Sequence, residues 1–301
     1  MSELDCNASL QNVSDPDCNV NYGPVVGYIL APIGTEIADV TTAKLLATWT
    51  ALINAIEGSR VYVINFTAGR SLNGTTPSQD EPVFEDTAFG GVRTPIRDGN
   101  KRNILMFKNL PICTIKTLRS LNNQKWEAFE LTKNGYIRGY SPDGTKLQGF
   151  RIMFQSGNEA LPESADVGHA FSIYIDYYQP EQWDDSGIWA KPTAFDIEDL
   201  EGIINVALTL QSASSTEIVV DVKTKCGSVG VSGLVTADFL LTLDSDGSTV
   251  AVTATESTTV AGRYTLAGTF TLAAHTLKTK DQPDATTKGY ETPTAIAVTP
   301  S

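Results

Sequence analysis

The pattern that most restricts the fold of this chain lies in residues 125–178, where short apolar–polar alternations are separated by tight-turn residues. An Asn-Gly pair at 134–135 and a Pro-Asp-Gly triplet at 142–144 contain residue types that accept positive φ or preset a turn. Over 170–178 the apolar side chains occupy every second position, so they share one face of an extended strand. This region therefore predicts an antiparallel meander of strands at 126–132, 136–140, 146–155 and 170–178.

The residues before the meander predict further strands and a first helix. Strands are expected at 25–31, 60–66 and 103–108. A helix is expected over 41–56, with Asp39 or Thr41 as its N-cap. Its apolar residues recur at helical spacing and predict one buried stripe, made of Leu45, Leu46, Trp49, Leu52, Ile53 and Ile56.

A second, shorter helix is predicted to begin at Leu110-Pro111, because proline is well tolerated in the first turn of a helix. Its apolar stripe consists of Ile112, Ile115, Leu118 and Leu121. We expect both helices to pack on one side of a largely antiparallel sheet or barrel.

Three polar segments separate these elements. Residues 1–22 predict an arm that is ordered only where it lies on another surface. Residues 67–100 show little periodicity over a length that is unusual inside a compact domain. We interpret them as a long loop arm that pairs with a neighbouring subunit, anchored by apolar residues at 83–84 and 88–89; a disordered loop is the alternative. Residues 181–202 are acidic, contain two prolines and predict a linker.

Residues 203–301 predict a different kind of domain. About seven short alternating stretches with turn residues between them, and no helical pattern, are typical of an immunoglobulin-like β-sandwich. The segment V-A-G-R-Y-T-L at 260–266 resembles the G-x-Y-T-L strand of bacterial and phage immunoglobulin-like modules. The predicted fold is therefore mainly β: a β-sandwich or barrel with two flanking helices over 23–180, followed by an immunoglobulin-like β-sandwich.

Charge and composition limit the possible partners. The net charge is −13, of which residues 1–202 carry −10, so the surface lacks the clustered cations that hold nucleic acid by its phosphates. No apolar run is long enough to span a membrane, and no secretory signal is visible, so we expect folding in a cytoplasm.

The interpretation of the cysteines and the glycosylation sequons follows from the expected cytoplasmic location. The four cysteines are expected to be free thiols, with a Cys6–Cys18 disulfide as the alternative in an oxidising compartment. The sequons at Asn7, Asn12, Asn65 and Asn73 are interpreted as chance occurrences.

No catalytic, cofactor-binding or metal-binding residue is predicted. There is no G-x-S-x-G motif, and His169 and His275 are interpreted as sheet-edge histidines rather than general bases. The acidic linker lacks the ligand spacing of a Ca²⁺ loop, and Gly90-Gly91 lacks the context of a phosphate loop. A carboxylate pair for glycoside hydrolysis stays open, because its separation is a property of the fold. Aromatic residues, including Trp126, Trp183 and Trp189, are expected to pack in cores and interfaces; a sugar-stacking surface is the alternative.

This layout of an acidic first domain, a long arm at 67–100, paired hairpins and an immunoglobulin-like end resembles that of bacteriophage tail tube (major tail) proteins. The resemblance implies hexameric rings that stack into a tube, with other copies and other virion proteins as partners. It also implies assembly in the host cytoplasm, a place in the phage tail, and passage of DNA without sequence-specific binding. A capsid decoration protein, a head–tail connector, a secreted glycan-binding adhesin and a hydrolase are the alternatives.

Under this interpretation the outward face of the 170–178 strand meets neighbouring subunits or a channel. That face carries Ser172, Tyr174 and Asp176. We expect charge reversal at Asp176 to disturb assembly or DNA passage before it disturbs folding.

Overall fold

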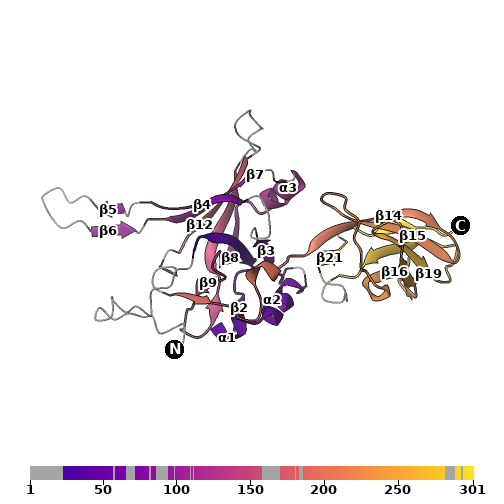
Figure 1. Ribbon diagram of the computed structural model, residues 1–301, viewed down its shortest axis with the longest axis horizontal. Helices are drawn as coiled ribbons and strands as arrows, with labels where there is room; N and C mark the ends of the chain where they lie inside the picture. The colour runs from indigo at the N-terminus through magenta and orange to yellow at the C-terminus, as the bar shows by residue number, and fades with distance from the viewer. Residues whose placement is uncertain are drawn as a thin grey trace. The chain divides into compact units, whose positions relative to one another are not determined.

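The structure is a computed structural model (Figure 1) that describes residues 23–56, 58–65, 72–80, 83–85, 94–97, 99–108, 110, 112–157, 170–179, 181–182, 186–281, 289–292 and 294–301. Strands make up 45% of it and helices 13%, so the chain is mainly β, as predicted. It divides into two compact units, with the main boundary between Glu201 and Gly202 and with residues 54–56 grouped in the second unit. The expected arm at 1–22 lies outside the described residues.

The first unit is built around an 11-stranded sheet in which all the strand pairs are antiparallel. Its main path runs in the order β2-β10-β9-β8-β11-β12-β7-β4, with β1 between β8 and β3, and β13 on β9. Its strands are β1 (Val25–Ala31), β2 (Glu36–Ile37), β3 (Tyr62–Asn65), β4 (Leu72–Gln79), β7 (Lys101–Lys108), β8 (Gln124–Thr132), β9 (Ile137–Tyr140), β10 (Leu147–Gln148), β11 (Phe150–Ser156), β12 (Ala170–Tyr177) and β13 (Gly187–Ala190).

The predicted meander forms, but one of its pairings differs from the prediction. β8 and β9 pair across the Asn-Gly turn, where Gly135 has a φ of +83°. The strand expected at 146–155 divides at Gly149: β10 pairs with β9, whereas β11 returns to pair with β8. A Cβ atom at Gly149 would lie 2.7 Å from the backbone nitrogen of Ala128. The chain therefore crosses from one partner to the other where only glycine fits.

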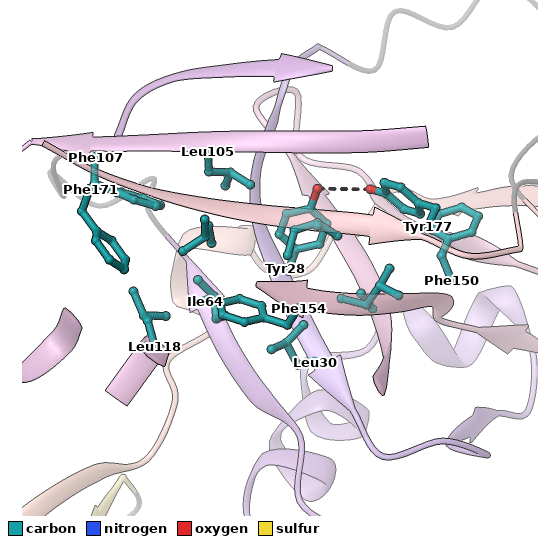
Figure 2. Close-up of a cluster of buried hydrophobic side chains, with 14 of the residues drawn as sticks. Tyr28, Leu30, Ile64, Leu105, Phe107, Leu118, Phe150, Phe154, Phe171 and Tyr177 are labelled. Atoms are coloured by element: carbon teal, nitrogen blue, oxygen red, sulfur yellow. Dashed lines mark hydrogen bonds between the residues drawn. The ribbon is translucent and has the colours of Figure 1, made fainter. Parts of the chain in front are cut away.

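The main core lies against one face of this curved sheet. The predicted alternation in β12 is confirmed, because Phe171, Ile173, Ile175 and Tyr177 are all buried. Figure 2 shows their neighbours, which come from β1, β3, β7, β11 and α3 (Ile112–Ser120) and include Tyr28, Leu30, Ile64, Leu105, Phe107, Leu118, Phe150 and Phe154. Apolar residues from distant segments thus meet in one cluster, and this burial is the main stabilising contribution to the unit.

The helices differ from the prediction in number and in position. The expected helix at 41–56 is two helices, α1 (Val40–Ala43) and α2 (Leu46–Ile53), and Asp39 caps α1 by accepting a hydrogen bond from the Thr42 N–H at 2.6 Å. The predicted apolar stripe is only partly buried: Trp49 and Ile53 are inside, whereas Leu45, Leu46 and Ile56 are exposed.

The two helical parts pack on opposite faces of β8 rather than on one side. Trp49 of α2 meets Phe129 edge-on, with ring centroids 5.1 Å apart. Ile115 and Leu118 of α3 join the main core, to which the adjacent β8 residue Ala128 belongs. Because adjacent residues of a strand point to opposite faces, β8 is buried on both sides. In Figure 1, α3 lies beside β7 near the top of the first unit, and α1 and α2 lie at its bottom.

The segment 67–100 is more regular than the sequence suggests. β4 runs antiparallel to β7 of the same chain, and β5 (Val83–Glu85) pairs with β6 (Thr94–Arg97) as a separate two-stranded sheet. The expected lack of regular structure is wrong for these strands, since polar residues and Pro77 hide a strand pattern that pairing with β7 imposes. Pairing of the arm with a neighbouring subunit stays a prediction. The apolar anchor expected at 88–89 lies outside the described residues.

The second unit consists of two antiparallel sheets, apart from one parallel pair between β14 and β21. One has the order β18-β19-β15-β14-β21 and the other β17-β16-β20-β22. Their bounds are β14 (Ile204–Ala213), β15 (Glu217–Thr224), β16 (Phe239–Leu243), β17 (Thr249–Val250), β18 (Thr253–Glu256), β19 (Arg263–Ala267), β20 (His275–Thr279), β21 (Tyr290–Glu291) and β22 (Ile296–Val298). Residues of both sheets, such as Val220, Tyr264, Leu241 and Leu277, form one core.

The G-R-Y-T-L segment of this unit has a distinct structural role at each of its first three positions. Gly262 has a φ of +75°, and a Cβ there would lie 2.5 Å from the Val222 carbonyl oxygen. Arg263 forms two hydrogen bonds with the Asp221 carboxylate, at 2.6 and 3.1 Å. The buried Tyr264 hydroxyl donates to the Val231 carbonyl at 2.8 Å and accepts from the Leu234 N–H at 3.1 Å.

Two expectations about the cysteines and histidines are wrong. Cys113 and Cys226 each take part in a disulfide bond, so they are not free thiols; sequence spacing alone does not reveal such pairing. His275 lies in β20, between β16 and β22, and is therefore in a central strand rather than at an edge. Cys6, Cys18 and His169 lie outside the described residues.

Candidate functional site

A cavity of about 450 Å³ opens in the first unit where β1 and β7 begin and where β4, β8 and β12 end. Its lining brings together residues that are up to about 150 positions apart in the sequence. They are Gly23, Pro24, Val25, Pro77, Ser78, Lys101, Arg102, Asn103, Glu130, Arg138 and Tyr177. The antiparallel sheet positions them, because the strand ends that meet here belong to neighbouring strands of the curved sheet.

A chain of hydrogen bonds runs along the inner wall of this cavity. The Asn103 side-chain amide donates through Nδ2 to the Tyr28 hydroxyl at 2.7 Å. The Tyr28 and Tyr177 hydroxyls lie 3.1 Å apart, and Figure 2 shows this contact between two rings that come from different strands. The Tyr177 hydroxyl in turn donates to Oε1 of Glu130. Four polar side chains are thus connected inside an otherwise apolar region.

The carboxylate at the end of this chain is buried, and Glu130 is only 2% exposed. Its second oxygen lies 3.4 Å from Nη1 of Arg138, which supplies a compensating charge. A buried carboxylate without a nearby cation would be strongly disfavoured. The Glu130–Arg138 pair therefore keeps a negative charge inside the cavity wall.

Tyr28 and Tyr177, the two tyrosines of this hydrogen-bond chain, resist ionisation. Burial raises the pKa of Tyr28 far above its ordinary value, and the nearby Glu130 charge raises it further. The pKa of Tyr177 is raised in the same direction, first by burial and then by Glu130. At neutral pH these phenols are hydrogen-bond donors and acceptors, not bases or nucleophiles.

The described lining of the cavity combines a few charged side chains with polar and apolar ones. Its described lining contains no histidine or cysteine, and its one serine, Ser78, has no neighbouring base among those residues. The lining includes the cationic side chains of Lys101, Arg102 and Arg138 and one carboxylate, Glu130, while Arg102 is itself paired with Asp176 outside the lining. The cavity is therefore locally cationic in a chain whose net charge is −13.

The outward face of β12 contains the residues for which a contact with neighbours or with DNA is expected. Asp176 is paired with Arg102 of β7, which contacts both carboxylate oxygens and lies directly opposite in the strand register. The Arg102 guanidinium also lies 5.5 Å from the ring centre of Tyr174. The hydrogen bond to Asp176 raises the pKa of Arg102. The Asp176 charge is thus already neutralised within its own chain.

The structure does not combine the other residues considered in the sequence into a site. Among the described residues, no group of three or more His, Cys, Asp or Glu side chains could hold a metal ion. In the acidic linker, Ile197–Asp199 form a short 3₁₀ turn, while Trp183 lies outside the described part of the chain. Trp126 packs edge-on against Tyr62 at 5.5 Å, and Trp189 lies in β13. No helix among the described residues is long and apolar enough to cross a membrane.

Sequence reasoning missed the cavity because its residues are scattered along the chain. One local signal was present: Glu130 interrupts the apolar strand between Phe129 and Leu131. A charged residue in such a position is rarely buried unless it is paired. Its partner Arg138, however, is identified only by the pairing of Glu130 with Arg138 in the β8–β9 register.

Comparison with known proteins does not assign the chain to a family. No protein-family model matches the chain, and no curated protein matches it significantly.

Proposed function

We propose that this chain is a virion structural protein whose copies assemble into hexameric rings stacked as a phage tail tube, through which DNA passes during ejection. The observation that carries the proposal is the long edge strand β4, which lies at one end of the path through the large sheet. Among the described strands β4 pairs only with β7, so one row of its backbone groups, interrupted at Pro77, faces away from β7 and can meet a strand of another copy. Head-to-tail contacts of this kind close into rings when the rotation between copies allows it.

The charge of the chain supports the same proposal. Residues 1–202 carry a net charge of −10, and a tube built from such subunits would not bind the DNA backbone by releasing its counterions. DNA would be repelled from an acidic wall and would move past it without being trapped.

We further propose that the second unit is an immunoglobulin-like module displayed by the tube. In chain order, its strands β14, β15, β18 and β19 belong to one sheet and β16, β17, β20 and β22 to the other. Apart from β21 and β17, the order β18-β19-β15-β14 in one sheet and β16-β20-β22 in the other corresponds to that of a four-plus-three immunoglobulin sandwich, which supports this proposal. This strand order is the supporting observation. An inter-sheet disulfide is not, because Cys226 is the one cysteine in residues 203–301.

A matched pair of proline substitutions tests the role of the β4 edge. Pro77 lies opposite Asn103, and a proline fits a strand where its nitrogen faces away from the paired strand. The N–H of Thr75, two positions away, therefore faces the free edge, while that of Thr76 faces β7. We expect Thr75→Pro to leave the monomer folded and to abolish ring formation.

Thr76→Pro is the control, because it removes a hydrogen bond inside the sheet and should destabilise the monomer by about 1–3 kcal/mol. The two variants are compared by denaturant unfolding and by electron microscopy at matched protein concentration. Assembly of Thr75→Pro into the same rings as the unsubstituted chain would rule out the β4 edge as the contact between copies.

A further inference from the structure

The cavity at the end of the large sheet has the size and walls of a ligand site. Its volume of about 450 Å³ lies within the range of small-molecule pockets. Pro24, Val25, Pro77 and the Tyr177 ring give it apolar surfaces, and charged side chains line the same space. Such a mixture of apolar walls and a few converging polar groups is typical of sites that bind a small polar molecule in one orientation.

The strongest indication of a ligand is an unsatisfied acceptor in the wall. Asn103 is 6% exposed, and its Nδ2 is committed to the Tyr28 hydroxyl, which fixes the orientation of the amide. Its Oδ1 is buried and has no hydrogen-bond partner among the described residues. A buried acceptor in this state costs free energy until a donor reaches it. A hydroxyl or N–H group of a ligand would supply that donor.

The positively charged side chains of the cavity indicate a second feature of the ligand, a negative group. Lys101 and Asn103 are two positions apart in β7, so they share a face of the strand about 6–7 Å apart. A ligand that donates to Asn103 can therefore place a negative group beside Lys101. Arg138 adds positive charge deeper in the cavity, where it is paired with Glu130.

We propose that this cavity binds an acidic sugar, with a ring hydroxyl donating to Oδ1 of Asn103 and the carboxylate lying beside Lys101. A six-membered sugar ring with a carboxylate at one end spans the distance between these two side chains. Its apolar ring face can pack on Tyr177 and the two prolines, as sugar rings do on flat apolar surfaces. This inference does not rest on the proposed tube, because every residue that it invokes belongs to one copy and the titration below is made on the unassembled chain.

Titration of the full chain with three probes tests the proposal. Glucuronate has both features, glucose has the hydroxyls without the charge, and acetate has the charge without the hydroxyls. By calorimetry and saturation-transfer NMR, we expect glucuronate to bind, glucose to bind about fivefold more weakly, and acetate to give no saturable signal. Equal binding of acetate and glucuronate would indicate a simple anion site and overturn the proposal, as would the absence of glucuronate binding.

Variants locate the bound sugar. Lys101→Gln should weaken glucuronate binding about threefold to fivefold and leave glucose binding unchanged, since it removes the positive charge beside the carboxylate and keeps a polar side chain. Lys116→Gln, an equal charge change on the exposed face of α3, is the matched control and should change neither. Pro77→Trp should fill the cavity and abolish binding of both sugars, because position 77 is exposed, lines the cavity and lies directly opposite Asn103, on the same face of the sheet. Unchanged glucuronate affinity in both Lys101→Gln and Pro77→Trp would place the sugar elsewhere.

Discussion

At the scale of single residues, Tyr264 shows how one buried polar group couples stability to pH. Burial raises its pKa to about 12, and its hydroxyl is held by two backbone hydrogen bonds. Because the folded pKa is above the unfolded value of about 10, the stabilisation is fully present below pH 10 and is lost as the pH rises towards 12. We expect the free energy of unfolding of the second unit to fall by roughly 2 kcal/mol over this range.

Tyr264→Phe isolates this effect from that of the other tyrosines. The variant should be less stable at pH 8 by about 1–3 kcal/mol, because it leaves the Leu234 N–H and the Val231 carbonyl without their partner. The stability difference between the two proteins should shrink as the pH rises from 10 to 12 in denaturant titrations. A difference that stays constant with pH would show that the Tyr264 phenol does not titrate with the fold.

At the scale of elements, Gly149 is the point at which a predicted single strand becomes two. A Cβ atom there would lie 2.7 Å from the Ala128 nitrogen and 2.9 Å from the Glu127 carbonyl carbon, and backbone atoms cannot move aside cheaply. We expect Gly149→Ala to destabilise the first unit by about 2–3 kcal/mol in thermal or denaturant unfolding. Gly157→Ala, where the nearest atom is the Ser172 oxygen at 3.3 Å, should cost clearly less. Equal costs for the two changes would contradict this account of the strand crossing.

The elements also show what could be predicted from the sequence. β1 and β12 were predictable because their apolar residues alternate or run continuously and turn or loop residues flank them. β4 was not predictable, since L-N-G-T-T-P-S-Q has no apolar alternation and becomes a strand only by pairing with β7. The helix at 41–56 was predicted as one, because periodicity does not reveal the break at Lys44 and Leu45. The cavity could not be predicted, because strand register alone brings its residues together.

At the scale of the whole molecule, the two units differ in chemistry as well as in topology. The first has a curved antiparallel sheet with a cavity at its strand ends and most of the negative charge, and the second is a Thr- and Val-rich pair of sheets. The first unit is acidic and has the edge strand β4. Both features agree with the proposed tube subunit, which would contact other copies through strands and repel DNA. The disulfide-bonded Cys113 and Cys226 fit a particle that functions outside a reducing cytoplasm, as released virions do.

The most direct test of the central claim is cryo-electron microscopy of the purified full chain at high protein concentration. The account predicts six-membered rings, alone or stacked into tubes, in which a strand of one copy pairs with the β4 edge of the next. Monomers that form neither rings nor tubes under these conditions, or oligomers whose copies meet away from β4, would contradict it.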